Sequence, residues 1–285
     1  MSEKIIWITS YPKSGNTFVR SILSSLLYTK NGSFNFNLLD LIELFEQVKT
    51  FEFINKINKD DYRNLHKLEI LSKYWLDAQK NIVSNKSINP IYNIFKTHNA
   101  NLFVNSKIFT TPKFTAGIIY IIRDPREVVI SYSKHMGKNI DQTIDIVFNE
   151  KTAIKPKNNA PTSIISSWDL HYKSWKNTKA PKLILRYEDL IENTIDSIES
   201  IILFICNILQ INKEDLYNKK LNAFKTTDIE IFRRYELKFG FNESSKNTNF
   251  FGTAKKNTWK KILTEKQVRK IEEKFSTTMQ EMGYI

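Results

Sequence analysis

The chain has 285 residues, of which 41% are hydrophobic and 13% aromatic. This length and composition suit one large globular domain and argue against disorder. No apolar run approaches the ~20 residues of a membrane-spanning helix, and the N-terminus lacks the pattern of a signal peptide. The only cysteine, Cys206, lies in an apolar run and has no partner for an internal disulfide. These features predict a cytoplasmic protein without a transmembrane segment.

The chain is basic, with 43 Lys and Arg against 30 Asp and Glu and a formal net charge of +13. A basic balance favours anionic partners such as nucleotides, nucleic acids or acidic membranes. The lysines are spread along the chain instead of forming one block. We therefore expect an anionic nucleotide as a partner and no specific nucleic acid.

The first predicted element is a buried strand at residues 5–8, followed by a tight loop and a helix. Phe18, Ile22 and Leu26 would share one face of that helix. Residues 37–49 carry a one-sided apolar face that predicts a second helix, and residues 50–65 read as a loop.

Three further short apolar segments predict buried strands, at residues 91–95, 117–122 and 182–185. Helical stretches between them indicate a parallel sheet with both faces covered. Since no repeat or linker interrupts the chain, we predict a single α/β domain with a central parallel sheet flanked by helices. Ligands of such sheets bind at the carboxyl ends of the strands, where polar residues follow each segment.

Helix starts are marked in the second half of the chain as well. Asp124 is a suitable N-cap, and Pro125 suits a first helical turn. Thr264 and Gln267 have the spacing of a capping box. Residues 137–163 between these helices read as a loop and a candidate lid over a substrate.

The strongest motif is the loop Ser10-Tyr11-Pro12-Lys13-Ser14-Gly15-Asn16-Thr17-Phe18. A helix start offers unpaired N–H groups and a partial positive charge to a phosphate. Gly15 allows close backbone approach, Lys13 adds a charge and Thr17 a hydroxyl. The nucleoside triphosphate loop G-x-x-x-x-G-K-[ST] is absent, because here the lysine precedes the glycine.

This loop resembles the 5′-phosphosulfate loop of the cytosolic-type sulfotransferases, Y-P-K-S-G-T-T-W. Asn16 replaces a threonine and Phe18 a tryptophan, and both substitutions keep the chemical type. The resemblance implies that the co-substrate 3′-phosphoadenylyl sulfate (PAPS) is held by a continuous run of loop residues: Lys13, Ser14, Gly15, Asn16, Thr17 and Phe18.

A second motif runs from Tyr120 to Tyr132 and places Arg123 at a strand end before a capped helix. Ser131 lies two turns into that helix, so its hydroxyl returns to the face of the helix start. The segment resembles the family's 3′-phosphate-binding segment, R-N-P-K-D-V-A-V-S-Y. The resemblance assigns Arg123 and Ser131 to the 3′-phosphate.

The third motif is Lys96-Thr97-His98 after a strand. A histidine beside a lysine can act as a general base while the lysine neutralises developing charge. The family carries its catalytic histidine in K-T-H, which implies that His98 is the base and that Lys13 and Lys96 assist catalysis. His171 lies in another family-like segment, and we expect it to pack in the core.

Weaker matches follow toward the C-terminus. Leu185-Arg186-Tyr187-Glu188-Asp189 resembles L-x-Y-E-D, which places Tyr187 beside the adenine, and a later segment gives Thr227 an adenine contact. Where the family has Arg-Lys-Gly, this chain has Gly252-Thr253-Ala254. Lys255 and Lys256 are then candidate replacements in the 3′-phosphate clamp.

The resemblance covers about residues 5–275 and is thin in 30–90 and 137–163, where the family builds its acceptor pocket. It implies a P-loop-NTPase-like sulfotransferase fold over 1–285 and transfer of a sulfuryl group from PAPS to a hydroxyl or amine, leaving adenosine 3′,5′-bisphosphate (PAP). The acceptor stays open among small molecules, sugars and lipids. The family's dimer motif K-x-x-x-T-V-x-x-x-E is matched only at Lys260 and Thr264, so a homodimer is one possibility.

Two other classes remain open on the residues alone. One is a nucleotide kinase of related fold, which would need a triphosphate-type loop and carboxylates for Mg²⁺. The other is a non-catalytic nucleotide- or nucleic-acid-binding protein. The sequence has no cluster of His and Cys ligands, so no metal is expected.

Overall fold

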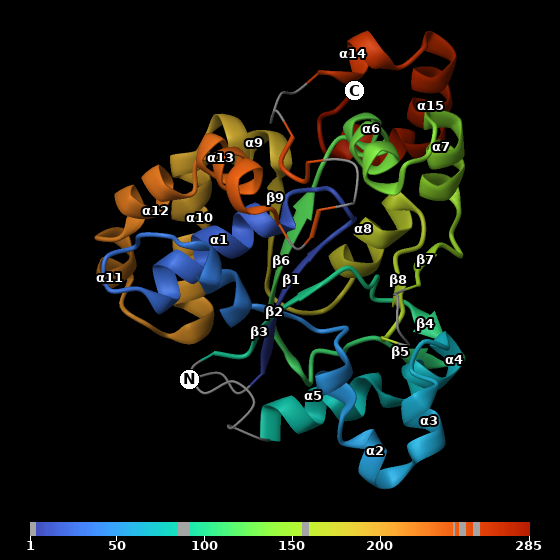
Figure 1. Cartoon of the computed structure of the whole chain (residues 1–285), viewed down its shortest axis with the longest axis vertical. Helices are drawn as coiled ribbons and strands as arrows, with labels where there is room; N and C mark the ends of the chain where they lie inside the picture. Colours follow the sequence, from blue (N-terminus) through green and yellow to red (C-terminus); the bar gives the residue numbers. More distant parts are fainter. Residues whose placement is uncertain (1–3, 85–91, 156–159, 242, 245–248, 253–256) are drawn as a thin grey trace.

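The computed structural model describes residues 4–84, 92–155, 160–241, 243–244, 249–252 and 257–285. Its centre is a parallel sheet of five strands in the order β2-β3-β1-β6-β9 (Figure 1). The strands in this order span Glu43–Leu44, Ile94–Thr97, Ile5–Ser10, Thr115–Ile122 and Lys182–Arg186.

The central strand β1 is buried along its whole length. Successive side chains of a strand point to opposite faces. Accordingly, Ile6 and Ile8 belong to one apolar cluster, whereas Ile5 and Trp7 belong to another. The unbroken apolar run that predicted this strand is thus explained by a sheet covered on both faces.

Helices form a layer on each face of the sheet (Figure 1). The layer over Ile6 and Ile8 contains α1 Asn16–Tyr28, α10 Thr194–Leu209, α11 Lys213–Tyr217, α12 Lys220–Thr226 and α13 Ile229–Phe239. The opposite layer contains α5 Trp75–Ser84, α6 Pro125–Met136, α7 Ile140–Phe148, α8 Trp168–Lys176 and α15 Glu265–Glu281.

Short elements complete the described chain. The helical ones are η1 Phe36–Leu41, η2 Val48–Phe51, α2 Ile54–Ile57, α3 Lys59–Arg63, α4 Leu68–Leu71, η3 Ser72–Tyr74, α9 Tyr187–Glu192 and α14 Trp259–Ile262. Two small antiparallel pairs join β4 Phe103–Val104 to β5 Lys107–Ile108 and β7 Ala153–Ile154 to β8 Ser163–Ile164.

The strand order fixes where a ligand can bind. From β1 the sheet grows toward β3 and β2 on one side and toward β6 and β9 on the other. Loops at such a reversal point diverge and leave a crevice at the carboxyl ends of the strands. The loop 11–15 between β1 and α1 lies at this point.

The predicted strands and their parallel arrangement are confirmed, with β3 beginning at Ile94. The predicted helix at 37–49 is wrong, because η1, β2 and η2 occupy this stretch. Ile42 and Phe45 enter the clusters on opposite faces of the sheet. A helix would have kept residues three apart on one face, whereas a chain that adds a strand to the sheet edge separates them.

The two loop predictions are also wrong in part. Residues 50–65 contain α2 and α3, and 137–163 contain α7, β7 and the start of β8. A capping box of Asn139 and Gln142 begins α7, so the signal for this helix was present in the sequence. The predicted N-cap at Asp124 and the capping box of Thr264 and Gln267 are confirmed.

Candidate active site

The loop between β1 and α1 has a backbone that few residues tolerate. Lys13 has a φ of 67° and Gly15 a φ of 100°. A Cβ atom on Gly15 would lie 2.5 Å from the Tyr187 ring. Glycine is therefore required at position 15 both by its dihedral angle and by the aromatic ring against it.

Side chains from both sides brace this loop. The Asn16 amide donates to the Ile8 carbonyl and lies near the Ser10 hydroxyl, both at 3.3 Å. From the neighbouring strand end, Arg123 Nη1 donates to the Lys13 carbonyl at 3.0 Å. The positive-φ conformation is thus held by contacts with β1 and with the residue that follows β6.

Several polar atoms around the loop are buried and lack a hydrogen-bond partner among the described residues. They include the Ser14 hydroxyl, Asn16 Oδ1 and Arg123 Nε. A buried donor without a partner is unfavourable by about 1–3 kcal/mol. An anionic group at the start of α1 would accept from the Ser14 hydroxyl and from Arg123, so these residues fit a bound phosphate.

The loop is strongly electropositive. The pKa of Lys13 is lowered to about 8, mainly by burial and in addition by the charges of Arg123 and Lys96. The Lys13 ammonium lies 3.8 Å from the centre of the Phe250 ring. Arg123 and Lys96 are thus close enough to Lys13 to disfavour its charged form, and a cluster of three cations favours a polyanion.

His98 lies at the end of β3 and is held by the neighbouring strand. Its Nδ1 is 2.8 Å from the Ser10 carbonyl oxygen, which can only accept, so Nδ1 carries the proton. Burial, followed by the charge of Lys96, lowers the pKa of His98 to about 3. The ring is consequently neutral near pH 7, with Nε2 unprotonated and able to accept a proton.

His171 supports His98 from α8. Its Nε2 donates to the His98 carbonyl at 3.1 Å, and the Tyr120 hydroxyl donates to its Nδ1 at 2.8 Å. The side chain is completely buried, and burial lowers its pKa to about 3. His171 therefore has the packed position expected from the sequence, and its hydrogen bonds also fix the backbone of His98.

Lys96 is buried and forms an ion pair with a carboxylate that is far away in the sequence. Its Nζ lies 3.0 Å from Glu243 Oε2, and Arg20 Nη1 lies 2.8 Å from Glu243 Oε1. The Thr17 hydroxyl also donates to Glu243 Oε2, at 3.3 Å. Lys96 and Arg20 hold the pKa of Glu243 far below its usual range, although burial alone would raise it.

A second buried carboxylate, Glu46, lies on the other side of β3. It accepts hydrogen bonds from Thr97 and Asn99, the two neighbours of His98 in the chain. Its Oε2 has no partner among the described residues, and burial raises its pKa to about 7. Glu46 thus clamps the segment that carries the candidate base.

The second motif meets the first at Arg123. The guanidinium lies 4.3 Å from the centre of the Tyr187 ring, which itself packs on Gly15. It is also 3.7 Å from Glu127 on the first turn of α6. Ser131 lies half-buried on the same helix. Arg123, Tyr187 and the loop after β1 are therefore brought together.

The other residues expected to contact the nucleotide are either packed within the protein or outside the described residues. Phe18 is buried in the apolar cluster beneath α1, with its ring centre 6.4 Å from that of Phe232. Thr227 is fully buried, and its hydroxyl donates to the Ala223 carbonyl at 2.8 Å. Lys255 and Lys256 lie outside the described residues.

The sulfotransferase domain family profile matches residues 3–283, nearly the whole sequence. The chain belongs to the sulfotransferase domain family. No curated protein sequence matches it significantly. The described residues contain no group of three or more His, Cys, Asp or Glu that could hold a metal ion, and none of their helices is long and apolar enough to cross a membrane.

Solved structures show the same fold at low sequence identity. Retinol dehydratase in complex with androsterone and PAP is 15% identical, with a TM-score of 0.57 over 98% of this chain and 81% of its own. Mouse sulfotransferase SULT7A1 complexed with PAP is 15% identical, with a TM-score of 0.57, and the match covers 98% of this chain and 86% of that one. Retinol dehydratase in a complex with retinol and PAP is 16% identical, with a TM-score of 0.56, and the match covers 98% of this chain and 82% of that one. The P-loop-like sulfotransferase fold predicted from the sequence is confirmed.

Sequence reasoning did not identify three charged residues of this sulfotransferase site, namely Arg20, Glu243 and Glu46. A signal for Arg20 existed, because it lies three residues after Thr17 and is the only charged residue of α1. No pattern pointed to Glu243, which reaches the site from a segment more than 200 residues farther along the chain.

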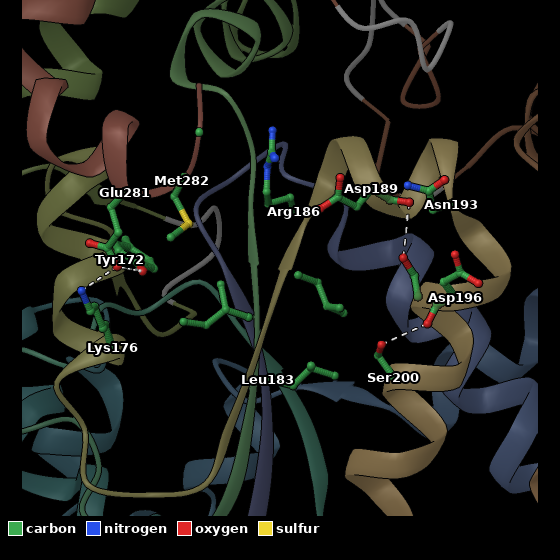
Figure 2. A pocket seen from close by; sticks show the side chains of 14 residues that line it. Tyr172, Lys176, Leu183, Arg186, Asp189, Asn193, Asp196, Ser200, Glu281 and Met282 are labelled. Atoms are coloured by element: carbon green, nitrogen blue, oxygen red, sulfur yellow. Dashed lines mark hydrogen bonds and ion pairs between the residues drawn. The ribbon is translucent and has the colours of Figure 1, made fainter. Parts of the chain in front are cut away.

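A cavity of about 760 Å³ lies beside the edge strand β9 (Figure 2). Its lining includes Leu183, Arg186, Asp189, Tyr172 and Glu281, and it includes none of the loop residues 13–18. This cavity is therefore separate from the charged site at the end of β1.

Proposed function

We propose that this sulfotransferase moves a sulfuryl group from PAPS to a hydroxyl or amine of an acceptor and releases PAP. The observation that carries the proposal is the neutral His98 ring, fixed by the Ser10 carbonyl next to a cationic loop. A proton acceptor and an anion-binding loop thus lie at the ends of two neighbouring strands, β3 and β1, as transfer between a nucleotide and a neutral nucleophile requires.

The nucleotide would be held by residues from three strand ends. The loop residues Lys13 to Thr17 would bind the 5′-phosphosulfate. The Ser14 hydroxyl, which has no hydrogen-bond partner among the described residues, would donate to it. Arg123 and Ser131 would bind the 3′-phosphate. Phe18, Tyr187 and Thr227 would line the adenine site, and Lys255 with Lys256 would complete the 3′-phosphate clamp.

In the reaction, the acceptor oxygen or nitrogen attacks sulfur in line while the bond to the 5′-phosphate oxygen breaks. His98 Nε2 takes the acceptor proton as the new bond forms. Lys13 stabilises the charge that grows on the leaving phosphate oxygen, and Lys96 holds the transferring group. Lysine charges here would serve the purpose that Mg²⁺ serves in phosphoryl transfer.

The acceptor is proposed to be a small molecule, sugar or lipid that enters beside residues 30–90 and 137–163. Two of the similar structures contain androsterone and retinol, which supports a hydroxyl-bearing acceptor. The single cysteine, free and buried, agrees with a reducing compartment such as the cytoplasm, and a homodimer remains an expectation from the sequence.

The test is an acceptor screen with PAPS labelled in its sulfuryl group, using alcohols, phenols, amines, sugars and lipids. We expect label to move to at least one acceptor class with the wild-type protein and to be almost lost with Lys13→Ala, which removes the charge at the leaving oxygen. Absence of transfer to every class, with PAPS shown to bind, would contradict the proposal.

A further inference from the structure

A buried carboxylate occupies the charged site at the start of α1. Glu243 accepts from Arg20 at 2.8 Å, from Lys96 at 3.0 Å and from the Thr17 hydroxyl at 3.3 Å. Two cations and a hydroxyl thus converge on one acidic group. Donors arranged in this way form an anion site, and the Glu243 carboxylate is its present occupant.

Arg20 is fixed before any ligand arrives. Its Nε donates to the Ile42 carbonyl at 3.2 Å and its Nη2 to the Leu39 carbonyl at 2.9 Å. Only 6% of the residue is exposed. These backbone bonds orient Nη1 toward Glu243, so the guanidinium requires an anion at that point whether or not Glu243 supplies it.

Two of the three donors have a place in the proposed transfer. Thr17 belongs to the 5′-phosphosulfate loop, and Lys96 would hold the transferring group. A carboxylate bound to these donors and a phosphosulfate bound to them would repel each other and compete for the same hydrogen bonds.

We propose that Arg20, Lys96 and Thr17 form a subsite for the 5′ end of the donor, and that Glu243 occupies this subsite when no donor is bound. Arg20 is then a further donor-binding residue, and Glu243 is an internal competitor that the donor displaces. This inference rests on the proposed function for the identity of the donor, whereas the anion subsite itself can be tested with simple ions.

The first test measures binding of PAP, adenosine 3′-phosphate and inorganic sulfate by calorimetry. With Glu243→Gln the charge of the competitor is lost, so affinity for PAP and sulfate should rise about 10- to 100-fold, the range of a charge-assisted hydrogen bond. Adenosine 3′-phosphate has no 5′ group, and its affinity should stay the same.

The matched control is Glu230→Gln on α13. Glu230 pairs with Arg233 at the surface, so this variant removes the same charge away from the subsite. It should leave the affinities for PAP and sulfate within about twofold of wild type, because exposed charges are screened by salt. If Glu230→Gln raised the affinity for PAP and sulfate as much as Glu243→Gln does, the effect would come from net charge alone, and the inference would be overturned.

The second test removes the fixed cation. Arg20→Lys keeps the charge but loses the fork that binds two carbonyls and an anion. In the Glu243→Gln background it should reverse most of the gain in PAP affinity. Glu243→Asp retracts the carboxylate by one methylene and should raise PAP affinity less than Glu243→Gln does. It replaces Glu243→Gln in the test if Glu243→Gln does not fold.

The outcomes separate this inference from the proposed function. Sulfate binding that rises in Glu243→Gln and falls again with Arg20→Lys supports the subsite even if PAP fails to bind, and in that case the proposed function is wrong. PAP binding that neither Glu243→Gln nor Glu243→Asp strengthens overturns the subsite and leaves the proposed function standing.

Discussion

The Ser10 carbonyl decides which nitrogen of His98 can act as a base. Because a carbonyl only accepts, Nδ1 keeps the proton and Nε2 is left to take one. Burial then keeps the ring neutral by lowering its pKa to about 3. In our proposal, the same two features that hold the ring also prepare it to accept a proton.

His98→Ala should reduce turnover by roughly 10²–10⁴-fold, the range for loss of a general base. PAP affinity should change little, because the imidazole faces the acceptor and not the nucleotide in our proposal. Steady-state kinetics and calorimetry measure the two quantities. A variant with near-normal turnover on a hydroxyl acceptor would show that His98 is not the base.

Lys13 should make nucleotide binding depend on pH. Its pKa is lowered to about 8, so the ammonium loses its proton as pH rises through 8. An anion binds the charged form, and PAP affinity should therefore fall between pH 7 and pH 9. Lys13→Arg stays charged over this range and should flatten the profile. An equally steep profile in Lys13→Arg would assign the titration to another group.

The positions of several residues that the structure brings together were predictable, because they belong to motifs next to strand ends. Lys13, His98 and Arg123 are of this kind. Glu243 was not predictable, since an acidic residue in a polar segment carries no sign of a buried partner. Its contacts with Arg20 arise only when the C-terminal part of the chain folds over α1.

At the scale of elements, the turn from β1 into α1 determines whether the loop forms. The Tyr187 ring from the start of α9 packs where a side chain at position 15 would lie. The strand, the turn and α9 are therefore assembled around a residue that has no Cβ.

Gly15→Ala should destabilise the protein by more than the ~1–3 kcal/mol of backbone strain alone, because the new methyl group would also displace Tyr187. It should weaken PAP binding as well. Gly137→Ala is the control, since Gly137 also has a positive φ, of 64°, but nothing lies within 4 Å of its Cβ position. Urea unfolding compares the two variants, and equal losses would contradict the packing argument.

Strands were easier to predict than the segments at the edge of the sheet. A strand covered on both faces is a short apolar run, which the sequence shows directly. Residues 37–49 are also rich in apolar side chains, but Ile42 and Phe45 lie on opposite faces of the sheet. This division depends on β2 pairing with β3, a contact over some 50 residues that local periodicity does not contain.

At the scale of the whole molecule, the parallel sheet brings distant motifs together. The ends of β1, β3, β6 and β9 lie on one edge, so residues near 13, 98, 123 and 187 meet although they are far apart in sequence. This convergence was predictable from the topology rule for parallel sheets. The positions of the described parts of segments 30–90 and 137–163 were not, since they depend on long-range packing that no local sequence pattern contains.

Buried histidines should make the whole fold sensitive to acid. His98 and His171 have pKa values near 3 when folded and near 6.5 when unfolded. The unfolded chain thus binds more protons, and stability should fall as pH decreases from 6.5 toward 3. Glu46, with its pKa raised to about 7, opposes this between pH 7 and 4.5. In urea unfolding at several pH values, His171→Gln should show a shallower loss below pH 4.5, and an unchanged slope would contradict the assignment.

The central claim is that the site at the end of β1 binds a nucleotide with 5′ and 3′ anionic groups for sulfuryl transfer. The most direct measurement compares the melting temperature with PAP and with ATP plus Mg²⁺ at equal concentrations. A ligand at 100 times its dissociation constant adds about 2.7 kcal/mol of stability. The account predicts that PAP raises the melting temperature more than ATP with Mg²⁺ does. Equal or greater stabilisation by ATP with Mg²⁺ would contradict it and favour a kinase.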